Sequence, residues 1–170
     1  KYATTVSDIL DLSNHYKDKS FVKITEKKLP FYDKEFDFVI ASHVAEHVED
    51  VSFFLGEIAR IGKKGYIEVP TRLEDNLVFE NKKAHIWHLV FDDIKNQINI
   101  SKKQQYFEPV LTIGTIKKLN DYFRESLVIE LNWEDTIEFN IVDNDSTLSK
   151  VSILNLLKKY FSKRIRLLIK

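Results

Sequence analysis

The sequence predicts an α/β fold, an open sheet with helices on both faces, and three observations lead to this class. The middle of the chain alternates between an apolar stretch of strand length, a helical pattern and a second apolar stretch, which is typical of strands joined by crossover helices. The chain has 170 residues, enough for one domain with little room for two. With 44% hydrophobic and 31% charged residues, it can bury a core, so it is not a disordered chain.

We expect two short strands near the N-terminus, at residues 4–12 and 21–25. Residues 29–35 read as a loop because Pro30 fixes the backbone and has no N–H to donate. The apolar run at residues 36–41 has the length of a strand, and both of its faces are expected to be buried, as in the middle of a parallel sheet.

Residues 44–61 show apolar side chains at helical spacing, so we expect a helix with Asp50 as an internal cap. Residues 62–65 read as a turn, with Gly62 capping the end of the helix. A short strand follows at residues 66–69 and ends at Pro70.

After Pro70 the alternation weakens, and we expect a mixture of short elements. The expected elements are a short helix at residues 73–79, paired strands at 86–91 and 97–101, a helix at 111–124, and strands at 127–133 and 136–142 joined by a tight turn.

The last 25 residues carry seven basic and no acidic side chains, and their apolar residues recur at steps of three and four. This pattern predicts an amphipathic helix at residues 146–170. We expect it to pack on the domain with a solvated basic face, and the alternative is contact with an anionic membrane or an acidic partner. Over the whole chain Lys+Arg and Asp+Glu balance at 26 each, so no bulk charge indicates nucleic acid.

The composition bears on compartment and chemistry as well. Cys is absent, which excludes disulfides, thiolate metal sites and a Cys nucleophile. The absence of Cys also fits a reducing compartment, so a cytoplasmic protein is expected. No apolar run approaches the ~20 residues that span a bilayer, and no signal-peptide pattern opens the chain. Because the first residue is Lys1 and Met is absent, we expect this chain to be part of a longer protein.

Residues 29–48, L-P-F-Y-D-K-E-F-D-F-V-I-A-S-H-V-A-E-H-V, resemble class I S-adenosylmethionine-dependent methyltransferases of the small, ubiquinone-biosynthesis-like (type 11) family. In that family an L-P-F loop precedes an F-D-x-V strand, a short S-H-x-x-E-H segment and a helix. An I-x-R segment, a Gly-containing turn and a strand ending in Pro then follow, as they do here up to Pro70. The resemblance covers about residues 21–70 and implies a Rossmann-like sheet.

The resemblance implies S-adenosylmethionine as cofactor and a set of residues that bind it. Asp8, with Asp11 close enough to compete, would accept hydrogen bonds from the ribose hydroxyls. Thr25 stands where the family has an Asp that contacts the adenine amine, and His43 or His47 would line the methionine end. The implied cofactor-binding residues are Asp8, Thr25, Glu26, Leu29, Ser42, His43 and His47.

The family's glycine-rich turn is absent, since no G-x-G occurs in the chain. We therefore expect residues 1–145 to form a methyltransferase-like domain that lacks the family's first strand and glycine loop. The helix at residues 146–170 is expected to pack on the same domain.

The reaction implied is methyl transfer to a small-molecule or sugar acceptor, with release of S-adenosylhomocysteine. Methyl transfer needs an acceptor atom held in line with the sulfonium and often a base for its proton, and histidine suits that role. The candidate catalytic residues are His43, His47, His85 and His88. Glu68 either meets the acceptor or pairs with Arg72.

Two alternatives remain at this point. A methyltransferase-like domain without catalysis would use the same sheet for binding or assembly, and the missing glycine loop and Thr25 favour it. The H-x-x-E-H of residues 43–47 also matches an inverted zinc-metallopeptidase motif, with His85 and His88 as further ligands. That motif belongs inside a helix, whereas His43 directly follows an apolar strand, so we predict no metal ligand.

Overall fold

The structure is a computed structural model, and it describes residues 3–144 and 152–168. In chain order the elements are β1 (Thr5–Asp8), β2 (Ser20–Lys23), β3 (Phe36–Ser42), α1 (Val51–Ile61), β4 (Gly62–Pro70), α2 (Arg72–Leu77), α3 (Asn81–Ala84), β5 (Trp87–Asp92), β6 (Gln97–Lys102), α4 (Ile113–Leu127), β7 (Val128–Glu134), β8 (Phe139–Ile141) and α5 (Ile153–Leu168). This mixture of strands and helices confirms the α/β class and is consistent with a Rossmann-like fold.

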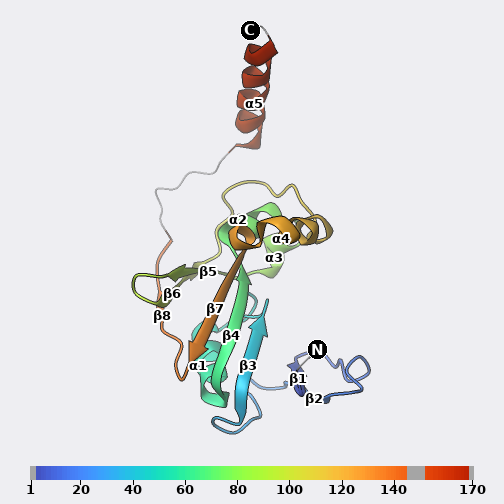
Figure 1. Cartoon of the computed structure of the whole chain (residues 1–170), viewed down its shortest axis with the longest axis vertical. Coiled ribbons are helices and arrows are strands. Elements are labelled where there is room, and N and C mark those ends of the chain that lie inside the picture. Colours follow the sequence, from blue (N-terminus) through green and yellow to red (C-terminus); the bar gives the residue numbers. More distant parts are fainter. Residues whose placement is uncertain (1–2, 145–151, 169–170) are drawn as a thin grey trace.

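The strands form three hydrogen-bonded groups (Figure 1). β1 and β2 pair in parallel as a two-stranded sheet. The central sheet has the order β3-β4-β7, with β3 and β4 parallel and β7 antiparallel to β4. The third sheet has the order β5-β6-β8, with an antiparallel β5–β6 pair and a parallel β6–β8 pair.

The main core lies between one face of the central sheet, α1 and the third sheet. Leu55 and Ile58 of α1 are buried together with Ile67 of β4, because these side chains form the apolar stripe of the helix and the inner face of the strand. Leu89 and Ile100 bring the third sheet into the same cluster. This shared core fixes the ends of β3 and β4 relative to β5.

The prediction that both faces of residues 36–41 are buried is wrong. Val39 and Ala41 point toward the core, whereas Phe38 is 47% and Ile40 61% exposed. Successive side chains of a strand point to opposite faces, and the face that carries Phe38 and Ile40 is open at these positions. An apolar run therefore did not mean burial on both sides.

The helix predicted at residues 44–61 begins later, at Val51. Asp50 is its N-terminal cap and accepts a hydrogen bond of 3.1 Å from the backbone N–H of Phe53. The helix cannot extend upstream because the carbonyl of Glu46 accepts the backbone N–H of Ile86 at 2.7 Å instead of an intrahelical donor. Gly62 is the predicted C-terminal cap.

Three other expectations change in the structure. Residues 62–65, predicted as a turn, are the first part of β4. The turn before Thr136 is present, and Asp135 has the φ of 58° that it requires. The strand after this turn, however, pairs with β6 instead of returning along β7. The pairing of β5 with β6 is confirmed.

The C-terminal helix is present as α5, and its described apolar side chains are exposed: Leu154 by 70% and Ile165 by 55%. Its packing on the domain stays a prediction, and residues 146–151 and 169–170 lie outside the described residues. None of the helices in the described part of the chain has the length and apolar character that crossing a lipid bilayer requires.

Candidate functional site

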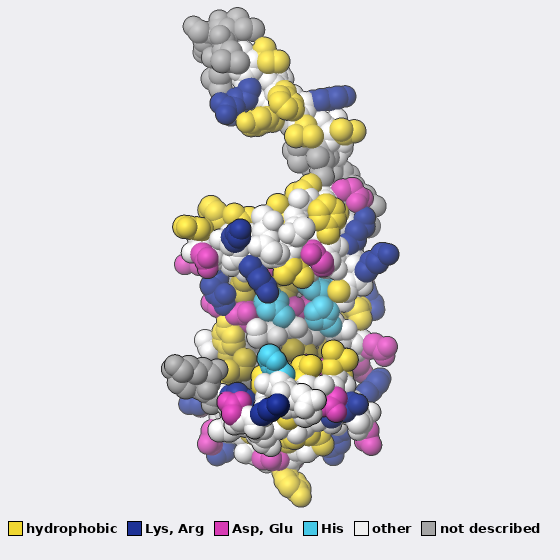
Figure 2. All heavy atoms as spheres, turned by 90° about the vertical axis from the view of Figure 1, so that its right-hand side faces the viewer, with side chains coloured by type: hydrophobic (Ala, Val, Ile, Leu, Met, Phe, Trp, Pro, Cys, Tyr) yellow, Lys and Arg dark blue, Asp and Glu magenta, His cyan; other side chains and the backbone are white. Residues whose placement is uncertain are grey.

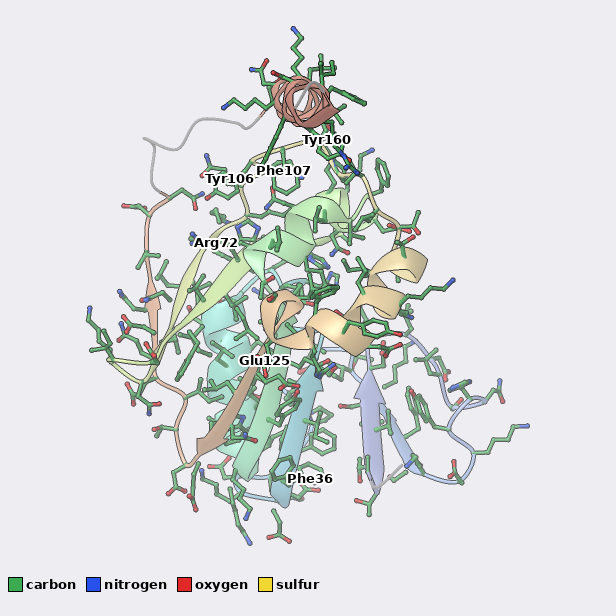
Figure 3. The ribbon with its side chains drawn as sticks, turned by 45° about the horizontal axis from the view of Figure 1, so that its top comes forward. Phe36, Arg72, Tyr106, Phe107, Glu125 and Tyr160 are labelled. Carbon is green, nitrogen blue, oxygen red and sulfur yellow. The ribbon has the colours of Figure 1, made fainter. Side chains whose placement is uncertain are left out.

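The candidate site lies at the carboxyl ends of the parallel strands. Figure 3 shows β1, β3 and β4 pointing toward the same end of the molecule, where α2 and α4 lie, with Phe36 at the opposite end of β3. Asp8 ends β1 and Ser42 ends β3. In open α/β sheets ligands bind at this end of the strands. Asp8 and Ser42 each lie at such an end, although β1 and β3 belong to different sheets.

His43 directly follows β3 and has a φ of 54°, a left-handed conformation that is uncommon for a residue other than glycine. Its backbone N–H donates to the carbonyl of Glu68 at 2.8 Å, which holds the turn against β4. Its ring lies between two acids, with Nδ1 3.2 Å from Oε1 of Glu46 and Nε2 3.3 Å from Oε1 of Glu68. The hydrogen bond with Glu46 raises the pKa of His43 above its ordinary value.

Glu68 is the centre of a hydrogen-bond network at the end of β4. Ser42 Oγ donates to its Oε1 at 3.0 Å, and the hydroxyl of Tyr66 lies 2.7 Å from its Oε2. Arg124 at the end of α4 forms an ion pair with Glu68, while Arg72 donates to Ser101 Oγ instead. Burial alone would raise the pKa of Glu68, but these hydrogen bonds hold it below the ordinary value. The expected alternative of a Glu68–Arg72 pair is therefore wrong.

A buried cluster of charged groups surrounds Asp75 of α2, which is 1% exposed. Its Oδ1 lies 2.6 Å from Nδ1 of His85 and 2.9 Å from Nζ of Lys103, and its Oδ2 lies 2.6 Å from Nε2 of His88. Burial opposes the charge of this carboxylate, but the hydrogen bonds from His85, His88 and Lys103 hold the pKa of Asp75 far below its ordinary value.

The sequence analysis missed Asp75 and Lys103. Asp75 lies 10 residues before His85, and Lys103 lies 28 residues after Asp75. No local pattern marks these contacts. His85 and His88 are buried together around Asp75. Figure 3 shows Tyr106, whose ring stacks on His88 with centroids 6.4 Å apart, in the segment that leads from β6 to α4.

Two further acids near this edge are buried with an oxygen that lacks a hydrogen-bond partner among the described residues. These oxygens are Oε2 of Glu46 and Oε2 of Glu74. Burial raises the pKa of Glu74. The charge of His43 opposes this effect, whereas the charges of Asp75, Glu46 and Glu68 add to it. The edge is therefore rich in negative charge that the surrounding protein compensates only in part.

The remaining predicted cofactor residues lie apart from this network. Oδ1 of Asp8 accepts the backbone N–H of Leu10 at 2.8 Å. Thr25 and Glu26 are exposed just after β2. Leu29 is buried, and its backbone N–H donates to Oε2 of Glu57 at 2.7 Å.

His47 is exposed, and its Nδ1 lies 3.0 Å from the carbonyl oxygen of Ala84. Its ring packs edge-to-face on that of His85, with centroids 4.5 Å apart. Figure 2 shows histidine side chains together on one face of the molecule, with acidic and basic groups beside them.

The H-x-x-E-H segment does not form the helix that the zinc-peptidase motif requires. Residues 45–47 form a turn before α1, and the two histidines have different partners. His43 contacts Glu46 and Glu68, whereas His47 contacts Ala84 and His85. The structure instead groups Glu46, His47 and His85, whose potential ligand atoms all lie within 4.8 Å of one another.

Comparison with known proteins adds one piece of information about the first part of the chain. Residues 5–67 match a family model described as a methyltransferase domain. The matched segment runs from β1 into β4 and includes Asp8, Ser42, His43 and His47, while His85 and His88 lie beyond it. No curated protein matches the chain.

Proposed function

We propose that this chain, whose residues 5–67 match a methyltransferase-domain family model, transfers a methyl group from S-adenosylmethionine to a small-molecule or sugar acceptor. The observation that carries the proposal is that the matched segment contains Asp8, at the end of β1, and Ser42 and His43, at the end of β3. The family match supports methyl transfer in general. The acceptor class rests on the balanced charge of the chain, which offers no bulk attraction for nucleic acid.

The residues at this edge fit an adenosine-containing cofactor. The carboxylate of Asp8 stands at the end of a parallel strand, where it would accept hydrogen bonds from ribose hydroxyls. The exposed hydroxyl of Thr25 would accept a hydrogen bond from the adenine amine. His43 and His47 would lie beside the methionine end. S-adenosylmethionine would supply the electrophilic methyl group, and the product would be S-adenosylhomocysteine.

We assign the handling of the acceptor's proton to His43. Its side chain is 41% exposed, so an acceptor can reach the ring, and Glu46 and Glu68 hold that ring in one orientation. In its neutral form His43 keeps one proton on Nδ1, which donates to Glu46, and Nε2 would take up the acceptor's proton. Both acids then stabilise the imidazolium, which is consistent with the raised pKa of His43. His85 and His88 would act as positioning residues through Asp75, because both are buried.

A calorimetric titration with S-adenosylhomocysteine tests the proposal. We expect binding at a one-to-one ratio with micromolar affinity, because S-adenosylhomocysteine shares the adenosine of the cofactor, including its ribose. Asp8→Asn should weaken binding, because it removes the charge that accepts both ribose hydroxyls. The matched control is Asp18→Asn, which changes an exposed acid in the loop between β1 and β2.

Binding that Asp8→Asn weakens and Asp18→Asn leaves unchanged supports the proposal. Absence of binding by the unsubstituted chain would overturn it, and the non-catalytic role in binding or assembly would take its place. Equal affinities of the two variants would show that Asp8 is not the ribose ligand.

A further inference from the structure

We propose that Glu46, His47 and His85 form a binding site for a divalent transition-metal ion of the zinc type, with one side open to solvent. Each of the three residues offers one ligand atom, and these atoms all lie within 4.8 Å of one another. The proposal goes beyond methyl transfer, which does not require a metal at these residues.

Two chain segments meet at the site and hold each other in place. Glu46 and His47 lie in the turn between β3 and α1, and His85 is the C-terminal cap of α3. The carbonyl of Glu46 accepts the backbone N–H of Ile86 at 2.7 Å. This backbone hydrogen bond fixes the two segments where the candidate ligands converge. The main chain therefore helps to hold the three ligand residues together.

The hydrogen bonds of the two histidines leave the same ring nitrogen free in each. Nδ1 of His47 lies 3.0 Å from the carbonyl oxygen of Ala84, which can only accept, so we assign the proton to Nδ1. Nδ1 of His85 lies 2.6 Å from Oδ1 of Asp75, which leads to the same assignment. Each Nε2 then keeps its lone pair. Metal-binding histidines commonly donate their other N–H to a carbonyl or a carboxylate in this way.

Glu46 supplies an independent indication that a ligand belongs here. Its side chain is 1% exposed, and its Oε1 lies 3.2 Å from Nδ1 of His43. Its Oε2 is buried and has no hydrogen-bond partner among the described residues. A buried carboxylate oxygen without a partner is costly, and a bound cation would compensate its charge.

The types of ligand select the kind of metal. Two imidazoles and one carboxylate suit zinc and its first-row neighbours, whereas Mg²⁺ and Ca²⁺ prefer oxygen ligands. Ligands around zinc at about 2.1 Å from the ion lie about 3.4 Å apart, so binding draws the three side chains slightly together. His47 is exposed, so solvent would complete the coordination on its side.

This site differs from the peptidase motif that the sequence contains. It uses Glu46 and His47 but not His43, whose two ring nitrogens face Glu46 and Glu68. The third ligand, His85, comes from beyond α3. In the peptidase motif the Glu acts as a base, whereas here we assign it to the metal itself.

The test is metal binding by the full chain, measured after treatment with a chelator and in the absence of S-adenosylmethionine. We expect equilibrium dialysis to give one zinc per chain, and Co²⁺ in its place to give visible absorption bands typical of four-coordinate cobalt. His47→Ala should lower the zinc affinity at least about tenfold, since it removes one of three protein ligands. The matched control is His15→Ala, an exposed histidine far from the cluster.

A second variant tests the buried ligand Glu46. His85 is left unchanged because its replacement would also disturb Asp75. Glu46→Gln keeps the size of the side chain and removes its charge, and it should weaken zinc binding while thermal unfolding shows a folded protein. Absence of zinc binding by the unsubstituted chain would overturn the proposal. So would equal zinc affinities for His47→Ala and His15→Ala, which would indicate binding at scattered surface histidines.

Discussion

The backbone N–H of Leu29 donates a hydrogen bond of 2.7 Å to Oε2 of Glu57. Glu57 belongs to α1 and pairs with Arg60 one turn later, with Nε of Arg60 2.7 Å from Oε1 of Glu57. Arg60 in turn donates to the carbonyls of Leu29 at 3.0 Å and Phe31 at 2.8 Å. The Glu57–Arg60 ion pair of α1 thus holds the loop before β3 in place, through hydrogen bonds to the main chain of Leu29 and Phe31.

Replacing Glu57 with Gln should destabilise the fold by about 2 kcal/mol. The neutral amide loses the negative charge that binds Arg60 and accepts the N–H of Leu29. Urea unfolding at neutral pH measures this change. The control is Asp37→Asn, which breaks an exposed ion pair of 2.7 Å with Lys63 and should change the stability much less, because solvent screens this pair. Equal losses in the two variants would contradict the importance of the Glu57 contacts.

Glu57 also predicts a dependence of stability on pH. Hydrogen bonds from Arg60 hold the pKa of its carboxyl below the value of 4.5 that it has without such partners, although burial opposes this. A carboxyl with a lowered pKa in the folded state contributes stability above the unfolded value and loses it as the pH falls through the folded pKa. Urea midpoints measured from pH 7 to about pH 3 should therefore fall less steeply below about pH 4.5 in Glu57→Gln than in the unsubstituted chain.

Gly65→Ala should destabilise the fold by about 1–3 kcal/mol through overpacking. A Cβ at this position would overlap the backbone oxygen of Val39 and lie 2.5 Å from a ring carbon of Trp133. The matched control is Gly56→Ala in the middle of α1, where a Cβ would meet nothing within 4 Å and should stabilise the helix by up to about 1 kcal/mol. Chemical denaturation of both variants measures the change in the free energy of unfolding. If Gly65→Ala leaves this free energy unchanged, the close packing of β4 on β7 is refuted.

His43→Asn should lower the affinity for S-adenosylhomocysteine about tenfold if His43 lines the cofactor. Asn tolerates the φ of 54° at this position better than Ala does, so the melting temperature should change little. Losing a hydrogen bond from a charged ring accounts for an effect of this size. Calorimetry supplies the affinity, and an unchanged value would remove His43 from the cofactor site.

The exposed apolar side chains of α5 lead to a prediction about anionic membranes. Leu157 and Phe161 are exposed on the same helix as Lys158, Lys159 and Lys163, a combination typical of helices that lie at a lipid surface. The full chain should sediment with vesicles that contain anionic lipid, and less so at high salt. Vesicles of neutral lipid and the variant Lys158→Glu with Lys159→Glu are the controls. If the helix packs on the domain instead, none of these vesicles will retain the chain.

The local patterns of the sequence predicted most of the elements but not where they end. The strand at β3 and the pairing of β5 with β6 were predicted from apolar runs and turn residues, and both are confirmed. The start of α1 was missed by about two turns, because the N–H of Ile86 occupies the carbonyl of Glu46, which a longer helix would have used. A contact between segments so far apart has no local signal.

In the candidate site, too, local sequence patterns placed some residues, whereas contacts between separate segments could not be predicted. Ser42 and His43 could be placed after β3 from the sequence, since they directly follow an apolar run. The cluster of Asp75 with Lys103 could not, because the partners meet only through the packing of α2 on the third sheet. The grouping of His47 with His85 arises in the same way.

The two tryptophans of the chain lie in different surroundings, which makes intrinsic fluorescence informative. Trp133 is buried, and its indole N–H has no hydrogen-bond partner among the described residues. Trp87 is partly exposed, donates to the carbonyl of Val48 at 2.8 Å, and has Nζ of Lys102 4.1 Å from the centroid of its ring. The buried indole will therefore emit at shorter wavelength than the other. Trp87→Phe would leave a single emitter that reports unfolding of the core, and Trp133→Phe a single emitter beside the turn of His47.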